Sequence, residues 1–351
     1  MDDKLGKIDH RIFEDLIQAK CGHERKEVLT GPRFGTDVSV IDLQGGMAMA
    51  VTSDPLSLIP SLGLEESAWL SVHLITNDMA TTGFAPMYGQ FVLNLPATFS
   101  KEDFKTYWDY IHKFCTRLGV AITGGHTGFI EGQNSTIAGG GTFFTIAPRA
   151  QILTSSNAEP GDVILVTKQC AISSSSILAM SFPKTVRNKL GEEAYQEACG
   201  MFYQTSSLDD ALTAVGKQNR YNEITAMHDV TEGGVMGAIY EMACASGNGA
   251  VVYNDQVPVG RIPDAVCRLF SIDPRYCVGA GSMIITCKKD KVPLIINRLN
   301  EADIPCCPVG EVKEKEAGIK VAENNKETDL IYPEEDPYWA AFFNACKKGW
   351  K

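Results

Sequence analysis

A loop-like stretch at residues 154–161 (Thr-Ser-Ser-Asn-Ala-Glu-Pro-Gly) divides this sequence into two halves, and a strand-like run from Val163 to Thr167 follows at once. Both halves alternate apolar segments of strand period with segments of helical period. The pattern therefore predicts an α/β (α+β) protein of two domains, residues 1–155 and 160–351. With 351 residues, the chain is long enough to bury two cores.

In the first half, the spacing predicts a helical stripe at 12–17, a hairpin over 38–51, helices through 68–79 and 104–118, a strand at 91–95, and short strands at 120–123 and 142–146. Asn77 and Asp78 fall near the end of the helix through 68–79, which Gly83 and Pro86 stop. The glycine-rich runs between the two short strands are interpreted as turns.

The second half repeats the theme. Expected strands lie at 163–167, 250–253, 282–287 and 308–312, and expected helices lie at 172–182, 206–217, 234–245, 291–300 and 337–347. The segment from His228 to Val235 is interpreted as a turn that leads into the helix at 234–245.

Composition excludes several classes of protein. Hydrophobic residues at 44% and charged residues at 21% are typical of a folded chain, and no run of about 18 apolar residues predicts a membrane span. The net charge of −11 argues against nucleic acid as a partner. The eleven cysteines include no Cys-x-x-Cys, which favours buried free thiols over a zinc site. The first residues, Met1 to Lys4, lack an apolar signal core, so we expect a cytoplasmic protein.

Four aspartates stand in separate segments, each beside an apolar run: Asp37, Asp54, Asp78 and Asp229. Taken singly, each has the ordinary alternative of a turn former or a helix cap. Together they make chemical sense if they converge on a divalent metal that holds a polyphosphate. Mg²⁺ takes oxygen ligands and is usually held by a few carboxylates plus phosphate oxygens.

Asp229 is the strongest of the four, because Thr231 and Gly233-Gly234 form a tight turn into the following helix. Glu232 suits the first turn of that helix, where negative charge is favoured, and a capping charge is its ordinary alternative.

Glycine clusters supply candidate phosphate contacts. They are Gly124-Gly125-His126-Thr127-Gly128 and Gly139-Gly140-Gly141-Thr142. Successive N–H groups can hold anionic oxygens, although hairpin turns use the same residues. No Gly-x-x-x-x-Gly-Lys-Ser/Thr motif occurs, and no Gly-x-Gly-x-x-Gly opens a helix, which argues against Walker-type and Rossmann sites. The histidines within glycine-containing motifs are His126 and His228, each a candidate catalyst or a hydrogen-bonded scaffold residue.

In order and spacing, these segments resemble the PurM-like superfamily, also called AIR synthase-related, and most of all its HypE-like members. The sharpest matches are Gly35-Thr-Asp37-Val, Thr52-Ser-Asp54-Pro, Asn77-Asp78-Met-Ala-Thr-Thr-Gly83-Phe-Ala-Pro86, Gly124-Gly-His-Thr127 and His228-Asp-Val-Thr-Glu-Gly-Gly234. Together they span about residues 5 to 315 of the chain.

The resemblance implies a two-domain enzyme that binds ATP with Mg²⁺, usually as a homodimer whose N-terminal domains join their sheets. Its metal ligands would be Asp37, Asp54, Asp78 and Asp229. Its cofactor contacts would be Asn77, Gly124, Gly125, Thr127, Gly233 and Gly234, and its catalytic residues His126 and Asp229. The expected chemistry is phosphoryl transfer, which depends on positioning and charge neutralisation.

The sequence departs from the family pattern in places. HypE proteins use a carboxy-terminal cysteine that is carbamoylated and then dehydrated with ATP, whereas this sequence ends Cys346-Lys-Lys-Gly-Trp-Lys351. Thr36 stands where many members have a second acid. Lys20-Cys21-Gly22 differs in order and context from the reactive loop of selenophosphate synthetases.

Three functions remain open on the sequence. The first is a Mg²⁺- and ATP-dependent enzyme that activates a carboxamide-type or phosphate acceptor, which is a small molecule or a protein. The second is a small-molecule kinase like thiamine-monophosphate kinase. The third is a non-catalytic ATP-binding maturation factor.

Overall fold

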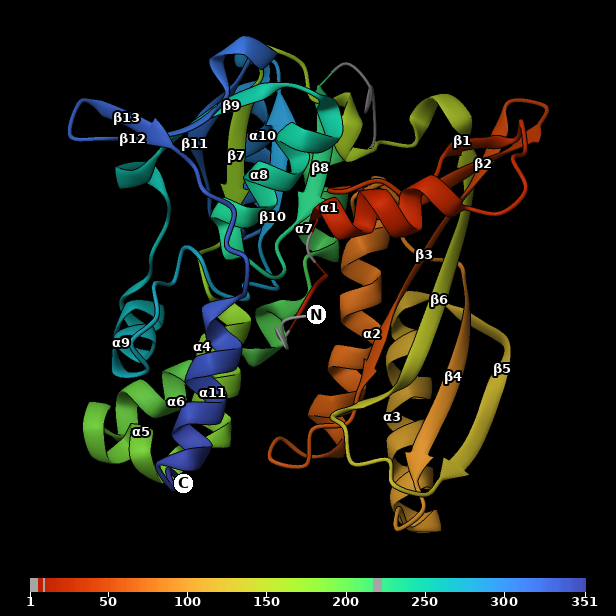
Figure 1. The fold of residues 1–351 in the computed structure, drawn as a ribbon, viewed down its shortest axis with the longest axis vertical. Coiled ribbons are helices and arrows are strands. Elements are labelled where there is room, and N and C mark those ends of the chain that lie inside the picture. The colour runs from red at the N-terminus through yellow and green to blue at the C-terminus, as the bar shows by residue number, and fades with distance from the viewer. Residues whose placement is uncertain (1–5, 9, 217–222) are drawn as a thin grey trace.

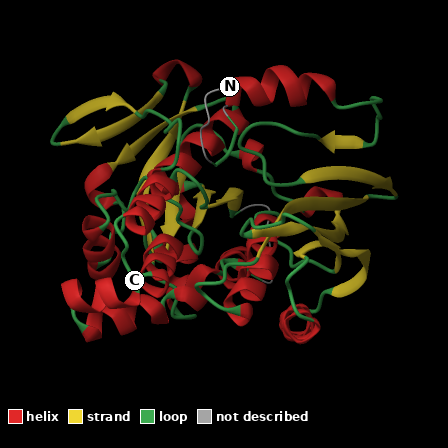
Figure 2. Ribbon diagram, turned by 60° about the horizontal axis from the view of Figure 1, so that its bottom comes forward, coloured by secondary structure: helices red, strands yellow, loops and turns green. Residues whose placement is uncertain are grey.

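The computed structural model describes residues 6–8, 10–216 and 223–351, which build two sheets, one in each half of the chain (Figure 1). A second view shows the strands of the two sheets as separate groups with helices around them (Figure 2). Among the described residues, no helix has the length and apolar character needed to cross a bilayer.

The N-terminal sheet has the order β1-β2-β3-β6-β4-β5. Its strands are β1 (Val28–Thr30), β2 (Ser39–Gln44), β3 (Met47–Ser57), β4 (Tyr88–Pro96), β5 (Ala121–Ile130) and β6 (Ile137–Pro148). Neighbouring strands are antiparallel except β4 and β5, which run parallel. Side chains alternate between the two faces of a strand, and Phe91, Leu93 and Leu95 of β4 are buried on one face.

Two helices, α2 (Leu64–Ala80) and α3 (Lys101–Leu118), share a core with those buried strand residues. The N-cap of α3 is Ser100, whose hydroxyl accepts from Asp103 N at 3.0 Å, and Gly119 ends it in the left-handed conformation. Apolar residues on the other face of the sheet, including Tyr88 and Val92, are exposed. One face of this sheet is therefore covered by helices while the other lies open.

The C-terminal sheet has the order β13-β12-β9-β11-β7-β10-β8. Its strands are β7 (Val163–Thr167), β8 (Ile224–Asp229), β9 (Gly249–Tyr253), β10 (Met283–Cys287), β11 (Cys306–Lys313), β12 (Ile319–Glu323) and β13 (Lys326–Asp329). Its helices are α4 (Ile172–Ser181), α5 (Pro183–Leu190), α6 (Glu192–Gly200), α7 (Leu208–Val215), α8 (Gly234–Ser246), α9 (Arg261–Leu269), α10 (Val292–Asn300) and α11 (Pro337–Lys347).

Helices cover both faces of this second sheet. Residues of α7 and α10 share a core with Leu165 and Ile285, whereas residues of α4, α8 and α9 share a core with Ile164 and Ile284. Consecutive strand residues thus point into different cores, as expected for a sheet between two layers of helices. Ahead of both sheets, α1 (His10–Ile12) continues through further helical turns to Lys20.

Most predicted elements are confirmed. The hairpin over 38–51 corresponds to β2 and β3, and the helix predicted at 337–347 is α11 with the same bounds. The α/β architecture with two sheets is also confirmed. The sequence did not predict β1, β8, β12, β13, α5, α6 or α9. The division between residues 155 and 160 stays a prediction, lying between the end of β6 and the start of β7.

Two predictions are corrected. The glycine-rich runs at 124–128 and 139–141 lie inside the long strands β5 and β6, not in turns. A Cβ on Gly125 would lie 1.8 Å from the carbonyl oxygen of Phe91, so glycine permits close pairing of β5 with β4. His228-Asp229, interpreted as the start of a turn, forms the end of strand β8.

Candidate functional site

Four carboxylates from four segments meet where the two halves of the chain adjoin. Asp37 precedes β2, Asp54 lies in β3, Asp78 is in the last turn of α2, and Asp229 is the last residue of β8. Ligand atoms of Asp37, His228 and Asp229 all lie within 4.8 Å of one another. The charges of Asp229, Asp54 and Asp37 also act on Asp78. The structure thus brings together all four predicted metal ligands.

The local structure explains how Asp54 and Asp78 come together. Thr52 and Asp54 are two residues apart in β3, so they lie on the same face of the sheet. The Thr52 hydroxyl donates to Asp78 Oδ2 at 2.8 Å. This hydrogen bond ties the end of α2 to the strand beneath it, next to Asp54.

The cluster holds more negative charge than its surroundings balance. Burial, followed by the charge of Asp37, raises the pKa of Asp229 to about 7. Burial raises the pKa of Asp54 to about 6, against the lowering effect of Lys7. Burial and the neighbouring Asp229 raise the pKa of Asp78 well above its usual range. A bound cation would relieve this repulsion.

His228 holds one of these acids in place. Its Nδ1 lies 2.7 Å from Asp37 Oδ2 and its Nε2 lies 3.0 Å from Glu241 Oε2. Burial lowers the pKa of His228, but the two carboxylates outweigh burial and the pKa is raised well above its usual value. Because both ring nitrogens face carboxylates, His228 acts here as a hydrogen-bond donor to Asp37.

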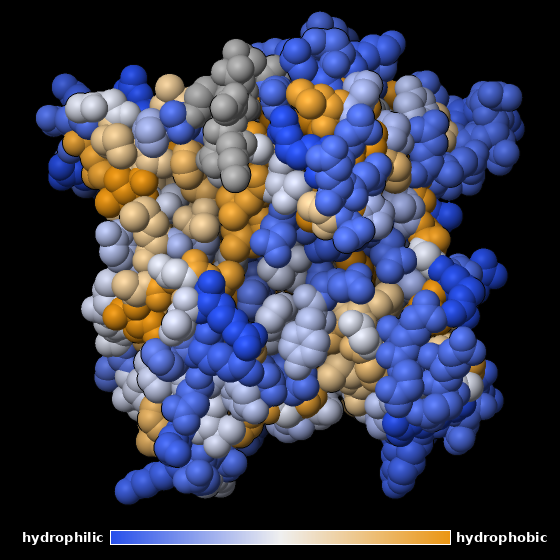
Figure 3. Space-filling model, turned by 180° about the vertical axis from the view of Figure 1, so that it is seen from behind, coloured by the Kyte–Doolittle hydropathy of each residue, from blue (hydrophilic) through white to orange (hydrophobic). Residues whose placement is uncertain are grey.

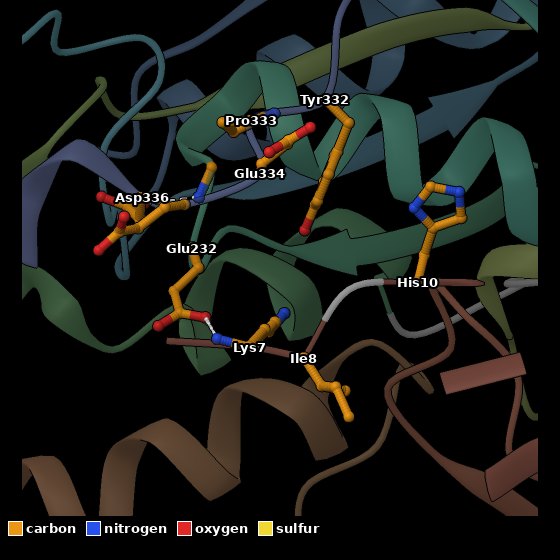
Figure 4. Close-up of a pocket in the computed structure, with 10 residues that line it drawn as sticks. Lys7, Ile8, His10, Glu232, Tyr332, Pro333, Glu334 and Asp336 are labelled. Carbon is orange, nitrogen blue, oxygen red and sulfur yellow. Dashed lines mark hydrogen bonds between the residues drawn. The ribbon is translucent and has the colours of Figure 1, made fainter. Parts of the chain in front are cut away.

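Two segments far apart in the sequence, one around Lys7 and the other around Tyr332, lie against this site (Figure 4). The backbone N–H of Lys7 donates to Glu232 Oε2 at 2.9 Å, and its Nζ donates to Thr231 Oγ1 at 3.0 Å. From the C-terminal part, the Tyr332 hydroxyl donates to Glu241 Oε1. A small pocket lies between these segments, with Lys7, Glu232 and Tyr332 among its lining residues.

The donor set fits a hard divalent cation such as Mg²⁺. The candidate ligands are carboxylate oxygens, which Mg²⁺ prefers, and the ring nitrogens of His228 are already engaged. One oxygen in particular, Asp229 Oδ2, is buried and has no hydrogen-bond partner among the residues that the structure describes. A buried acceptor of this kind is costly unless something binds it.

Three predicted cofactor contacts have other partners in the structure. Asn77 is fully buried, where its Nδ2 donates to Thr205 O at 2.8 Å and its Oδ1 accepts from Ser207 N at 2.8 Å. The N–H of Gly233 donates to Asp336 Oδ2 at 2.7 Å, and that of Gly234 donates to Thr231 O at 3.2 Å. Their polar groups are engaged within the protein, so we leave these three residues out of the proposed nucleotide site.

The predicted phosphate contacts on β5 lie apart from the acids within one chain. In the sheet register, Asp54 pairs with Gly141, Gly141 with Phe91, and Phe91 with Gly125. Three strand spacings separate Asp54 from Gly125, which is about 14 Å. The side chains of His126 and Thr127 follow on the same exposed edge strand.

Sequence reasoning missed several residues around the acids, notably Lys7, Glu241 and Tyr332. Glu241 had a usable signal, because an acid among Ile239, Met242 and other apolar residues of one helix must be buried beside a partner. Neither Lys7 nor Tyr332 stands in a pattern that distinguishes it. The expected capping role of Glu232 is replaced by hydrogen bonds from Lys7 N and from Trp339 Nε1.

The fold and the site together define a two-domain α/β protein with a buried acidic site where its domains meet. Residues 35–145 match the N-terminal domain of AIR synthase related proteins, and residues 159–322 match their C-terminal domain. The chain therefore belongs to the AIR synthase related family, as its motifs predicted.

Several curated relatives align with much of the chain. A hydrogenase expression/formation protein of Methanocaldococcus jannaschii is 25% identical over 66% of this chain and 65% of its own length. The carbamoyl dehydratase HypE of Cupriavidus necator is 24% identical over 80% of this chain and 76% of its own. A selenide, water dikinase of Methanococcus maripaludis is 26% identical over 89% of this chain and 90% of its own. The last two names are those of enzymes, which agrees with the prediction of an enzyme.

Solved structures share the fold. A HypE–HypF complex has a TM-score of 0.70 at 18% identity, covering 92% of this chain and 99% of that one. HypE in complex with ATP has a TM-score of 0.67 at 19% identity, covering 95% of this chain and 97% of that one. The PurM-like two-domain fold is therefore confirmed.

Proposed function

We propose that this protein is a Mg²⁺- and ATP-dependent enzyme of the HypE-like branch, which transfers the γ-phosphoryl group of ATP to activate a carboxamide-type or phosphate acceptor. The observation that carries this proposal is the gathering of Asp37, Asp54, Asp78 and Asp229 at one partly buried site. Similarity to HypE, including a HypE structure bound to ATP, supports the choice of nucleotide.

In this proposal the four aspartates hold the metal. Bound Mg²⁺ supplies charge neutralisation to the phosphates, which phosphoryl transfer requires. The chain itself orients the ligands: Thr52 fixes Asp78, and His228 fixes Asp37. Lys7 Nζ is placed to act on both Asp54 and Asp229, whose pKa values it lowers. Its ammonium would also attract an anionic phosphate at the same place.

We further propose a homodimer formed by the open face of the N-terminal sheet. Exposed apolar residues gather there, namely Met47, Tyr88, Val92, Ile130, Ile137 and Ile146. The view from behind shows hydrophobic surface on the side of the molecule that the N-terminal domain occupies (Figure 3). Such a patch is typical of an interface between subunits. A partner's β5 would then bring Gly124, Gly125, His126 and Thr127 to the nucleotide, in their predicted roles.

The HypE reaction on a terminal cysteine is not part of the proposal. Cys346 is exposed in the last turn of α11. The start of α11 lies near the site, through Asp336 and Gly233, and ten residues of helix place Cys346 about 15 Å further along. Thiamine-monophosphate kinase-like activity and pure ATP binding are not favoured, because relatives aligned over most of the chain carry the HypE and selenide, water dikinase names.

A screen of acceptors for stimulated ADP release tests this function. Carboxamides, carbamoyl compounds and phosphate esters would be added with Mg²⁺ and ATP, and ADP would be measured. We expect one class to raise ADP release well above the rate without an acceptor, and Asp229→Asn to remove the increase. Tight ATP binding with no ADP release for any acceptor would contradict an enzyme and favour a binding factor.

A further inference from the structure

A continuous line of hydrogen bonds leads from the C-terminal part of the chain to Asp37. The Tyr332 hydroxyl donates to Glu241 Oε1, and Glu241 Oε2 lies 3.0 Å from His228 Nε2. The other ring nitrogen, Nδ1, lies 2.7 Å from Asp37 Oδ2 and 3.2 Å from Ser155 Oγ. Four side chains thus stand in sequence, with a carboxylate on each side of the imidazole.

The middle of this line is closed to solvent. His228 is 1% exposed and Glu241 is 3% exposed. Glu241 lies on α8 among buried apolar residues, including Ile239 and Met242. Hydrogen bonds in such surroundings are strong and directional, because no water competes for the donors. The side chains of Glu241 and His228 are therefore held in fixed orientations.

The line also joins separate parts of the chain. Asp37 belongs to the N-terminal domain, in the loop before β2, whereas His228 and Glu241 lie on β8 and α8 of the C-terminal domain. Tyr332 comes from the segment between β13 and α11, and the Lys7 ammonium lies 3.6 Å from the same Glu241 oxygen. Figure 4 shows Lys7 and Tyr332 reaching into one space from opposite ends of the sequence.

We propose that Glu241 and Tyr332 are positioning residues for the metal site, acting through His228 to fix the carboxylate of Asp37. The proposal rests on the function proposed above. In this arrangement, the ligand set is complete only while the segment that contains Tyr332 is docked on α8. Outer carboxylates that orient a ligand in this way commonly change metal affinity about 10- to 100-fold when they are removed.

Binding of Mn²⁺, followed by electron paramagnetic resonance, gives a readout that does not need turnover. Free Mn²⁺ would be measured with the purified protein and a non-hydrolysable ATP analogue. Glu241→Gln keeps the size of the side chain but removes its charge and one acceptor oxygen, so we expect roughly tenfold weaker Mn²⁺ binding. Tyr332→Phe removes one hydrogen bond, so we expect a loss of roughly three- to tenfold.

The matched control is Tyr240→Phe. Tyr240 lies on the same helix, next to Glu241, and its ring centroid is 5.2 Å from that of Tyr332. Removing its hydroxyl leaves the line to Asp37 intact, so Mn²⁺ affinity should stay at the wild-type value. Circular dichroism and thermal melting of each variant would show whether it folds. If Glu241→Gln does not fold, the Mn²⁺ affinity of Tyr332→Phe alone tests the proposal.

The outcomes are distinct. Wild-type protein that does not bind Mn²⁺ with the analogue would contradict the proposed function, and this inference with it. Wild-type protein that binds, with both Glu241→Gln and Tyr332→Phe binding equally well, would overturn the inference alone. Variants that lower the melting temperature without weakening Mn²⁺ binding would likewise show a merely structural link between the domains.

Discussion

Helix α2 carries two ionisable side chains, the buried His73 and the partly buried Asp78, whose surroundings are opposite in character. His73 stacks on Trp69 with ring centroids 3.6 Å apart, and within the described part of the chain its Nδ1 has no hydrogen-bond partner. Burial lowers the pKa of His73 to about 3, so it is neutral. Asp78 instead lies beside three other acids, and its pKa is raised. The aromatic surroundings suit a neutral group, whereas the acidic surroundings need a cation.

This difference separates a part of α2 that serves folding from a part that, in the function proposed above, serves chemistry. The His73 region needs nothing from outside the protein, because a neutral imidazole among aromatic rings is close to an apolar side chain. The acid cluster is costly without a ligand, because like charges repel at low dielectric. Perturbing each region should therefore change a different measurement.

The largest expected effect is on nucleotide binding, and it comes from substituting Asp229, the acid of the cluster that lies in the C-terminal domain. Asp229→Asn removes a charge and alters the unpartnered Oδ2. We expect nucleotide binding that depends on Mg²⁺ to weaken by more than about 100-fold, beyond what an outer residue costs. Isothermal titration with a non-hydrolysable ATP analogue measures this loss. A variant that binds as tightly as the wild type would remove Asp229 from the ligand set.

The pH dependence of metal binding should be the next largest effect. The raised pKa values of Asp54, about 6, and Asp229, about 7, mean that protons compete with the cation as the pH falls. We expect Mn²⁺ affinity to fall roughly tenfold or more from pH 8 to pH 6. Affinity that is constant over this range would show that these carboxylates do not have to lose protons on binding.

In the metal-free protein, the acid cluster and His73 should change the pH dependence of stability in opposite directions. A raised carboxyl pKa contributes stability at low pH that is lost as the pH rises through about 6 to 7. The lowered pKa of His73 works the other way, because stability is lost as the pH falls below the unfolded value of about 6.5. We expect His73→Leu to reduce the loss of melting temperature between pH 6 and pH 4, with nucleotide affinity unchanged. If His73→Leu changed the nucleotide affinity, His73 would have to be counted as part of the nucleotide site.

The smallest expected effect is that of Cys346→Ser. Cys346 is exposed on α11, away from the start of the helix that adjoins the site. ATP turnover with an effective acceptor should stay within about twofold of the wild type, since exposed substitutions seldom disturb the fold. Loss of ATP turnover in Cys346→Ser would instead favour a reaction at the Cys346 thiol, as in HypE.

The sequence predicted the fold well where apolar periodicity was clear, as in α2 and α11. It failed at β5 and β6, because Gly125 and Gly141 look like turn residues. A Cβ on Gly141 would lie 2.4 Å from Ile75 Cδ1, so this glycine permits α2 to pack closely on the sheet. That need arises only from tertiary packing, which spacing along the chain does not reveal.

The sequence predicted the acids of the candidate site, but it did not predict the residues that surround them. Motif order indicated Asp37, Asp54, Asp78 and Asp229, and the structure brings them together. Lys7 and Tyr332 come from opposite ends of the chain, and only the folded structure brings them to Glu241. The cofactor role of Asn77 stays a prediction, and in the structure its side chain makes the contact with residues 205 and 207.

The central claim is that carboxylates from both domains jointly hold a metal with its nucleotide, and calorimetry of Asp78→Asn tests it most directly. Titration of a non-hydrolysable ATP analogue with and without Mg²⁺ should show binding that depends on Mg²⁺ in the wild type. The same titration should show none in Asp78→Asn, with the melting temperature of the metal-free variant equal to or above that of the wild type. Unchanged Mg²⁺-dependent affinity in the folded variant would contradict the claim.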